Sequence, residues 1–242
     1  MKKRLLAFLL ITCTVLSGFM LYHPVEDKKI LSHVIDLKEQ QLQLYWKDAQ
    51  GKNYGNFKHL KTALNEEGKE LIFAMNGGMY LEDASPQGLY IENGNTLKKT
   101  NTVKKAYGNF YLQPNGIFYI TKDNKGVVCP TTDFKNDGKV KYATQSGPML
   151  VIDGKIHPKF TKGSENVHVR NGVGVLPDGK LLFAMSKVVI NLYDFATYFK
   201  EKGCKNALYL DGFVSRTYLL SGEWKQLDGN FGVIIAETKD KE

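Results

Sequence analysis

VGVLPDGKLLFAM, residues 173–185, consists of two short apolar runs joined by the turn sequence Pro177-Asp178-Gly179. Asp-Gly supplies the positive φ that a tight hairpin turn requires, so this stretch predicts two antiparallel strands. Similar turn sequences recur at 92–95, 113–116 and 153–154, each beside short apolar runs. Repeated hairpins favour antiparallel pairing over a parallel sheet with crossover helices.

Two segments have apolar residues at helical spacing, and a glycine follows each of them. They predict helices over 56–67 and 191–202, ended by Gly68 and Gly203. Strands are predicted over 30–37, 41–46, 71–75, 89–91, 110–112, 117–120, 149–152, 173–176, 181–185, 207–210, 215–220 and 231–236. The expected fold class is therefore α+β, a mostly antiparallel mixed sheet built from hairpins with two principal helices packed against it.

The N-terminus has the pattern of a targeting segment. Met1-Lys2-Lys3-Arg4 is positively charged, and the apolar run that follows continues to Tyr22, with Ser17-Gly18 as small residues inside it. Residues 1–22 are therefore expected to be a signal peptide or an N-terminal membrane anchor. No linker divides the chain after residue 25, so 26–242 is expected to be one domain. Its location would be periplasmic or extracytoplasmic, or on the inner membrane if the segment is an anchor.

Composition narrows the class of partner. The 242 residues carry a formal net charge of +8, but Lys and Arg are scattered among acids, which argues against nucleic-acid binding. The five histidines are dispersed, so no structural metal site is expected, and no cofactor is implied. Beyond the N-terminal segment only Cys129 and Cys204 remain; they could pair, with two free thiols slightly favoured.

Four polar or glycine-containing stretches lie next to apolar strands. They are Asn76-Gly77-Gly78-Met79-Tyr80, Gln145-Ser146-Gly147-Pro148, Arg170-Asn171-Gly172-Val173-Gly174 and Asp211-Gly212-Phe213-Val214-Ser215. Strand ends are places where a rigid scaffold presents functional groups. Adjacent glycines can expose backbone N–H groups to a ligand, and the planar arginine fork matches two phosphate oxygens.

Each stretch also has an ordinary structural interpretation. The glycine pairs fit tight loops, Arg170 fits a solvated strand edge, and Asp211-Gly212 fits an Asx turn. A Ser/His/Asp triad is disfavoured, because no Gly-x-Ser-x-Gly elbow is present and Ser215 has no histidine near it in the sequence. Residue types alone leave both interpretations open.

In this order, and with Gly108-Asn-Phe-Tyr-Leu112 between them, the four stretches resemble the phosphodiester glycosidase family, over roughly residues 70–236. The resemblance implies catalytic roles for Asp211 and Arg170. It implies substrate contacts by Asn76, Gly77, Gly78, Gln145, Ser146, Gly147, Asn171, Gly212 and Ser215. Two departures stand out: Asn171-Gly172 replaces the family's Thr/Ser-Ala, and Phe213 replaces a glycine, which reshapes one rim of the site.

The family's reaction, hydrolysis of a sugar-1-phosphodiester, fits these residue types. The leaving phosphate is already a stable anion, so it needs charge neutralisation by Arg170 more than a proton. The developing positive charge at the anomeric carbon needs a carboxylate, for which Asp211 is the first candidate, with Glu82, Asp83 and Asp194 in reserve. The expected partner is a carbohydrate phosphate or glycan, with membrane association through residues 5–22.

Two alternatives remain open. One is a non-catalytic envelope protein of the same fold that binds a glycan or glycan phosphate. The other is phosphodiesterase chemistry, in which the P–O bond is cleaved instead of the C–O bond. The sequence does not distinguish C–O from P–O cleavage.

Overall fold

The computed structural model describes residues 28–222 and 224–241. In this part of the chain, strands form three antiparallel sheets and two α-helices pack against them, so the α+β prediction is confirmed. The single mixed sheet that the hairpins predict is instead divided into three. The predicted N-terminal signal segment lies outside the described residues. None of the helices within the described part is long and apolar enough to cross a membrane.

The first sheet has six strands and contains the hairpin predicted over residues 173–185. Its order is β1 (Ile30–Ile35), β12 (Leu181–Ser186), β11 (Asn171–Val175), β13 (Ala207–Asp211), β9 (Met149–Ile152) and β10 (Lys155–Ile156). Helix α2 (Leu192–Glu201) covers one face, with Phe195 and Phe199 fully buried. Gly172 and Gly174 allow this close approach, because a Cβ atom on either would lie within 3.3 Å of the Phe199 ring.

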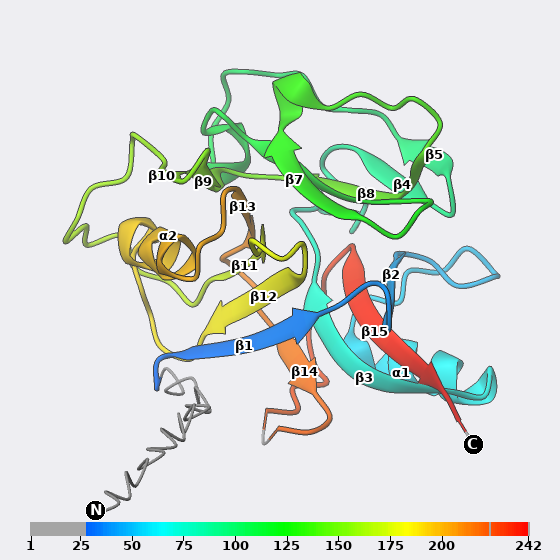
Figure 1. Cartoon of the computed structure of the whole chain (residues 1–242). Coiled ribbons are helices and arrows are strands. Elements are labelled where there is room, and N and C mark those ends of the chain that lie inside the picture. Colours follow the sequence, from blue (N-terminus) through cyan, green and yellow to red (C-terminus); the bar gives the residue numbers. More distant parts are fainter. Residues whose placement is uncertain (1–27, 223, 242) are drawn as a thin grey trace, which may run out of the picture.

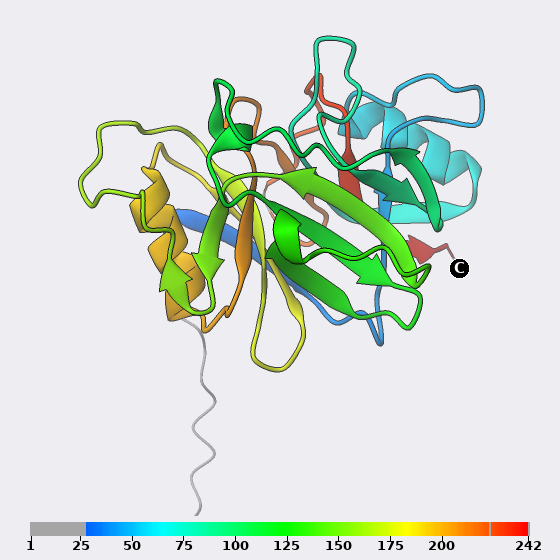
Figure 2. The same cartoon turned by 90° about the horizontal axis from the view of Figure 1, so that it is seen from above.

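The second sheet has four strands in the order β14 (Thr217–Leu219), β3 (Lys69–Asn76), β15 (Ile234–Asp240) and β2 (Gln41–Tyr45). Helix α1 (Phe57–Glu66) places Phe57, Leu60 and Leu64 against it, as the helical spacing predicts. Figures 1 and 2 show α1 and α2 on opposite flanks of the molecule.

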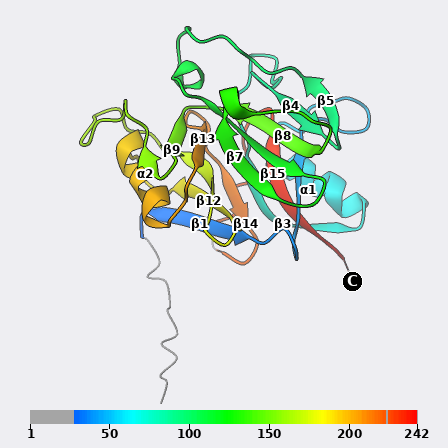
Figure 3. The same ribbon diagram turned by 45° about the horizontal axis from the view of Figure 1, so that its top comes forward.

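The third sheet has five strands, in the order β5 (Asn95–Lys98), β4 (Tyr90–Glu92), β8 (Val140–Ser146), β6 (Gly116–Thr121) and β7 (Gly126–Pro130). It lies above the other two in Figure 1, and Figure 3 shows its strands β7 and β8 in front of them. One phenylalanine from each sheet meets in the shared core. The ring of Phe183 lies 5.3 Å from that of Phe73 and 5.8 Å from that of Phe118. The three sheets therefore share a central hydrophobic cluster.

The strand predicted over 110–112 is wrong. Residues Asn109–Tyr111 form a short 3-10 helix, η1, in which the N–H groups of Tyr111 and Leu112 donate to the carbonyl oxygens of Gly108 and Asn109. Gly108 has a φ of 106°, which redirects the chain there. Phe110 is consequently buried beside Gly147 and does not join a sheet.

Candidate active site

A pocket of about 460 Å³ opens where the first and second sheets meet. One wall follows β3 and contains Met79, Tyr80, Leu81, Glu82 and Gln87. The other walls are Asn109 of η1 and the segment Asp211-Gly212-Phe213 at the end of β13. Residues from two of the four predicted stretches, and from the Gly108–Leu112 motif, thus line one cavity.

Asp211 supplies a buried carboxylate to this pocket. Its side chain is held at both oxygens: Asn76 Nδ2 donates to Oδ2 at 3.2 Å, and the backbone N–H of Phe213 donates to Oδ1 at 3.0 Å. Burial raises the pKa of Asp211 to about 6, against the opposing effect of these hydrogen bonds. A carboxyl group with this pKa changes charge close to neutral pH.

Asn76 and Asn171 form the support beneath Asp211. Asn171 Nδ2 donates to Oδ1 and to the carbonyl oxygen of Asn76, at 2.8 and 3.0 Å, and Asn171 Oδ1 accepts from the backbone N–H of Asp211 at 2.8 Å. Asn76 Oδ1 also accepts from the backbone N–H of Arg216 at 2.9 Å. The ends of β3, β11 and β13 are therefore joined by side-chain amides. Both asparagines are fully buried and are not among the residues that line the pocket.

The two glycines after Asn76 are required by packing. A Cβ on Gly77 would lie 2.6 Å from Ile235 Cγ1, and one on Gly78, whose φ is +154°, would lie 2.7 Å from Thr144 Oγ1. The Gly77 N–H already donates to the carbonyl oxygen of Val233 at 2.8 Å. These glycines let the chain pass between the second and third sheets on its way to the pocket wall.

Arg170 lies in the core next to the site, with its guanidinium bound to protein. Its Nε donates to the carbonyl oxygen of Ile190, NH2 donates to both oxygens of Asn166, and NH1 donates to the Tyr209 hydroxyl at 2.9 Å. The side chain is completely buried and does not line the pocket. Arg170 is therefore placed to act on the pocket through Tyr209, and a direct grip on a phosphate would require it to leave these acceptors.

Tyr209 connects Arg170 to the pocket floor. A Cβ on Gly212 would lie 1.3 Å from the Tyr209 hydroxyl oxygen, so only glycine fits between that hydroxyl and the pocket. Burial raises the pKa of Tyr209 to about 12, which keeps its hydroxyl protonated. Ser215 Oγ donates to the carbonyl oxygen of Asp211 at 2.5 Å and lies 3.1 Å from that of Val169. Gly212 and Ser215 thus shape the loop that carries Asp211.

The Gln145 stretch holds loops together. Gln145 Oε1 accepts from the backbone N–H groups of Leu89 and Asn101, and its Nε2 donates to the carbonyl oxygen of Asn101 and to Thr131 Oγ1. Ser146 Oγ donates to the carbonyl oxygen of Leu210 at 2.6 Å. On Gly147 a Cβ would lie 2.6 Å from that of Asn115. These polar groups are already satisfied within the protein, and their predicted contacts with substrate remain predictions.

Phe213, which the sequence predicts at one rim of the site, lines the pocket. The pocket also contains residues that sequence reasoning did not assign to the site: Met79, Tyr80, Leu81, Gln87 and Asn109. Met79 and Tyr80 lie inside a predicted stretch, and Asn109 lies in the Gly108–Leu112 motif, so a signal existed for these three. Leu81 and Gln87 had none. Tyr80 OH donates to the carbonyl oxygen of Asn230 at 2.6 Å, which fixes this wall to the loop before β15.

The charge of the pocket is negative. Of the described residues that line it, Asp211 and Glu82 are acidic and none is cationic. Among the reserve carboxylates, Glu82 lines the pocket, Asp83 is exposed beside it, and Asp194 Oδ2 accepts from Asn191 Nδ2 at the start of α2. The described part of the chain contains no group of three or more His, Cys, Asp or Glu side chains that could hold a metal ion.

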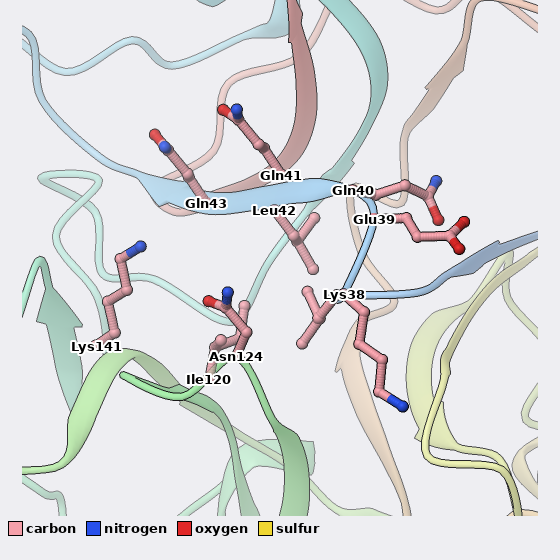
Figure 4. Close-up of a pocket in the computed structure, with 10 residues that line it drawn as sticks. Lys38, Glu39, Gln40, Gln41, Leu42, Gln43, Ile120, Asn124 and Lys141 are labelled. Carbon is pink, nitrogen blue, oxygen red and sulfur yellow. The ribbon is translucent and has the colours of Figure 1, made fainter.

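A second cavity, of about 420 Å³, lies between the start of β2 and the β6–β7 hairpin. Figure 4 shows the side chain of Leu42 directed into this space toward Ile120, while Gln41 and Gln43 leave the opposite side of the strand. Its one carboxylate, Glu39, is exposed. This second cavity contains no buried or restrained ionisable group. The candidate active site is therefore the pocket that contains Asp211.

Comparison with known proteins finds similarity over a part of the chain that includes the residues of this pocket. A family model described as phosphodiester glycosidase matches residues 69–238. The uncharacterized protein YigE of Escherichia coli (strain K12) is 36% identical over 194 residues, which cover 80% of this chain and 75% of that protein.

Two solved structures share the fold. One is the zebrafish N-acetylglucosamine-1-phosphodiester alpha-N-acetylglucosaminidase catalytic domain, auto-inhibited by its pro-peptide, with a TM-score of 0.59, 16% identity and coverage of 90% of this chain and 85% of that chain. The other is a protein from Burkholderia pseudomallei K96243, with a TM-score of 0.54, 11% identity and coverage of 86% and 73%. At these identities the two structures bear on the fold alone.

Proposed function

Because the chain belongs to the phosphodiester glycosidase family, as its motifs predict, we propose that it is a hydrolase that cleaves a sugar-1-phosphodiester at the anomeric carbon. The observation that carries this proposal is the buried Asp211 carboxylate at the floor of the pocket, held at both oxygens. The substrate would be glycan material of the envelope or of the extracellular space.

The chemistry assigned to Asp211 follows from its charge. Loss of the phosphate leaves positive charge on the anomeric carbon and ring oxygen, which a carboxylate held close by stabilises. Asn76 and the Phe213 N–H fix the orientation of the carboxylate before substrate binds, so little reorganisation is needed during the reaction. In this role Asp211 must be ionised, which requires a pH above its pKa of about 6.

The role proposed for Arg170 is to position the pocket floor. Its NH1 group orients the Tyr209 hydroxyl, and that hydroxyl lies directly beneath Gly212. Four hydrogen bonds to neutral acceptors fix the guanidinium, and no carboxylate among the described residues pairs with it. This buried positive charge next to the site also favours negative charge on a bound substrate.

Export is part of the proposal and rests on the sequence of residues 1–22. A positive start followed by an apolar run directs a chain across the inner membrane. Fractionation of cells that produce the full chain would test this. We expect the protein in the periplasm or the membrane fraction, and recovery in the cytoplasm alone would contradict it.

Hydrolysis in oxygen-18 water tests the bond that is cleaved. Cleavage at the anomeric carbon places the label in the released sugar, whereas cleavage at phosphorus places it in the phosphate. Label in the sugar, from the wild-type protein and not from Asp211→Asn, supports the proposal. Label in the phosphate refutes it, and binding without turnover would favour the non-catalytic alternative.

A further inference from the structure

Phe213 is an aromatic side chain that the fold leaves in water. It is 94% exposed, although it lies only two residues after the buried Asp211. Most large aromatic side chains in the described part of the chain are buried; Phe73, Phe118 and Phe183, for example, are at most 1% exposed. An exposed aromatic group beside a pocket is a common feature of ligand sites. Its apolar surface stays in contact with water when the protein folds, and a ligand can remove that surface from water.

The backbone fixes where this ring lies. The Phe213 N–H donates to Asp211 Oδ1, so the residue that presents the ring also orients the carboxylate. Leu81, 46% exposed, lines the same pocket from the loop after β3. Asp211 is 5% exposed and lies at the floor, so Phe213 and Leu81 form an apolar rim at the mouth.

The floor and the mouth would contact different parts of a substrate. The anomeric carbon must lie at Asp211, where Gln87 and Asn109 provide amide groups for sugar hydroxyls. The phosphate then points outward, toward water, which agrees with the lack of a cation among the described residues that line the pocket. The part of the substrate that reaches Phe213 and Leu81 is the alcohol esterified to the other side of the phosphate.

We propose that Phe213, with Leu81, is a specificity-determining contact for an apolar leaving-group alcohol. This rests on the proposed function, since it assumes a sugar-1-phosphodiester with its sugar at Asp211. The chemical class is a phosphodiester that joins a sugar to an aliphatic or aromatic alcohol. A polar alcohol would leave the rim in contact with hydroxyl groups that neither side chain can hydrogen-bond.

The test uses the leaving group alone, which makes it independent of the sugar and of turnover. Methyl phosphate and octyl phosphate, the latter kept below its micelle concentration, are titrated into the full chain and the Kd of each is measured by calorimetry. We expect octyl phosphate to bind about tenfold more tightly than methyl phosphate, the gain that burial of about two methylene groups provides. In Phe213→Ala this preference should fall below about threefold, and Phe213→Leu should keep part of it.

Leu97→Ala is the matched control, because Leu97 is a 50% exposed apolar side chain on β5 that does not line the pocket. It should retain the full preference for octyl phosphate. Equal affinity for the two phosphates in the wild type, or a preference that survives Phe213→Ala, would overturn the inference. Neither result concerns catalysis, whereas failure to hydrolyse any sugar-1-phosphodiester would overturn the proposed function and leave the measured preference intact.

Discussion

At the scale of single residues, the two oxygens of Asp211 have different partners, and this determines the effect of an amide in its place. In Asp211→Asn the oxygen can still accept from Phe213, but the new NH₂ group faces Asn76 Nδ2, which is also a donor. We expect turnover to fall at least a hundredfold and the stability to fall by about 1–2 kcal/mol. Turnover per folded molecule on an activated sugar-1-phosphodiester and the melting temperature measure the two effects.

The exposed Asp83, which lies near the same pocket, provides the control. Asp83→Asn removes the same charge from an exposed side chain, and the asparagine Oδ1 can still accept from the backbone N–H of Ser85. Turnover should stay within about twofold of the wild type, and stability within about 0.5 kcal/mol. If Asp211→Asn turned over at the wild-type rate with only a lower melting temperature, its carboxylate would be a turn-forming group. The catalytic role would then pass to Glu82.

Because the pKa of Asp211 is raised, activity and stability should change in opposite directions with pH. Burial raises the pKa from an unfolded value near 4 to about 6. Between these values the folded state binds more protons, so the contribution of Asp211 to stability is complete below about pH 4 and is lost as the pH rises through 6. The value of kcat/KM should instead rise over the same range, as the carboxylate ionises.

The difference between the wild type and Asp211→Asn isolates these effects from other titrating groups. In urea unfolding from pH 3.5 to 7, the stability of the wild type relative to the variant should decrease with pH. A relative stability independent of pH, or an acidic limb of kcat/KM near pH 4, would show that Asp211 has an ordinary pKa, and a relative stability that increased with pH would show a lowered pKa.

Arg170 and Tyr209 should act together if the arginine orients the hydroxyl beneath Gly212. Arg170→Lys cannot reproduce three separate hydrogen-bonded nitrogens, and we expect kcat to fall about tenfold or more with a smaller change in KM. Tyr209→Phe removes the bridging hydroxyl alone and should produce a large part of the same loss. In a double-mutant cycle the two losses should be less than additive, and full additivity would mean that Arg170 affects activity by another route.

At the scale of strands and loops, the sequence predicted which elements exist better than where their side chains point. Asn-Gly and Asp-Gly turns, whose φ requirements are local, predicted β4, β6, β9, β11 and β12. No strand was predicted at β5, β7, β8 or β10. The sequence also placed polar stretches next to the ends of the predicted strands β3, β11 and β13. The structure joins Asn76, Asn171 and Asp211 there by hydrogen bonds, although neither asparagine lines the pocket.

The directions of Arg170 and Gln145 depend on contacts distant in sequence, which no local pattern encodes. Gln145 bonds to Asn101, and Arg170 to Ile190 and Tyr209. A register shift between Asn171 and Gly172, opposite β13, further decides which side chains reach the site. The contact between Gly212 and the Tyr209 hydroxyl joins residues that are close in sequence. The hydroxyl, however, accepts a hydrogen bond from Arg170, which is distant in sequence.

The segment after β3 should tolerate no Cβ at Gly77. There the methyl group of alanine would lie 2.6 Å from Ile235 Cγ1 and 3.0 Å from Val233 Cγ1, both in the packed interface with β15. Gly77→Ala should therefore cost about 1–3 kcal/mol of stability. Urea unfolding measures this cost. Gly77→Ala should cost less when it is added to the Ile235→Ala variant than when it is added to the wild type. A Gly77→Ala variant as stable as the wild type would show that β3 and β15 are less tightly packed than described.

At the scale of the whole molecule, the site depends on how two sheets are joined. Asn76 belongs to the second sheet, whereas Asn171 and Asp211 belong to the first, so the pocket exists only where the two meet. A second polar junction between these sheets involves Glu237 of β15. Its Oε2 lies 2.6 Å from Nε2 of His33 on β1, and its Oε1 accepts from Gln40 Nε2 at 2.8 Å.

Substitution of Glu237 tests whether this junction only stabilises the contact between the sheets or also determines the geometry of the active site. Glu237→Ala leaves the half-buried His33 and Gln40 side chains without their partner, and we expect a loss of about 1–3 kcal/mol in urea unfolding. Glu70→Ala removes an exposed carboxylate from β3 and should cost under about 0.5 kcal/mol. Because the asparagine amides join the same sheets directly at Asp211, turnover per folded molecule should remain within about twofold in Glu237→Ala. A loss of turnover beyond about tenfold, with the chain still folded, would mean that the Asn76–Asn171 contact cannot hold the pocket without Glu237.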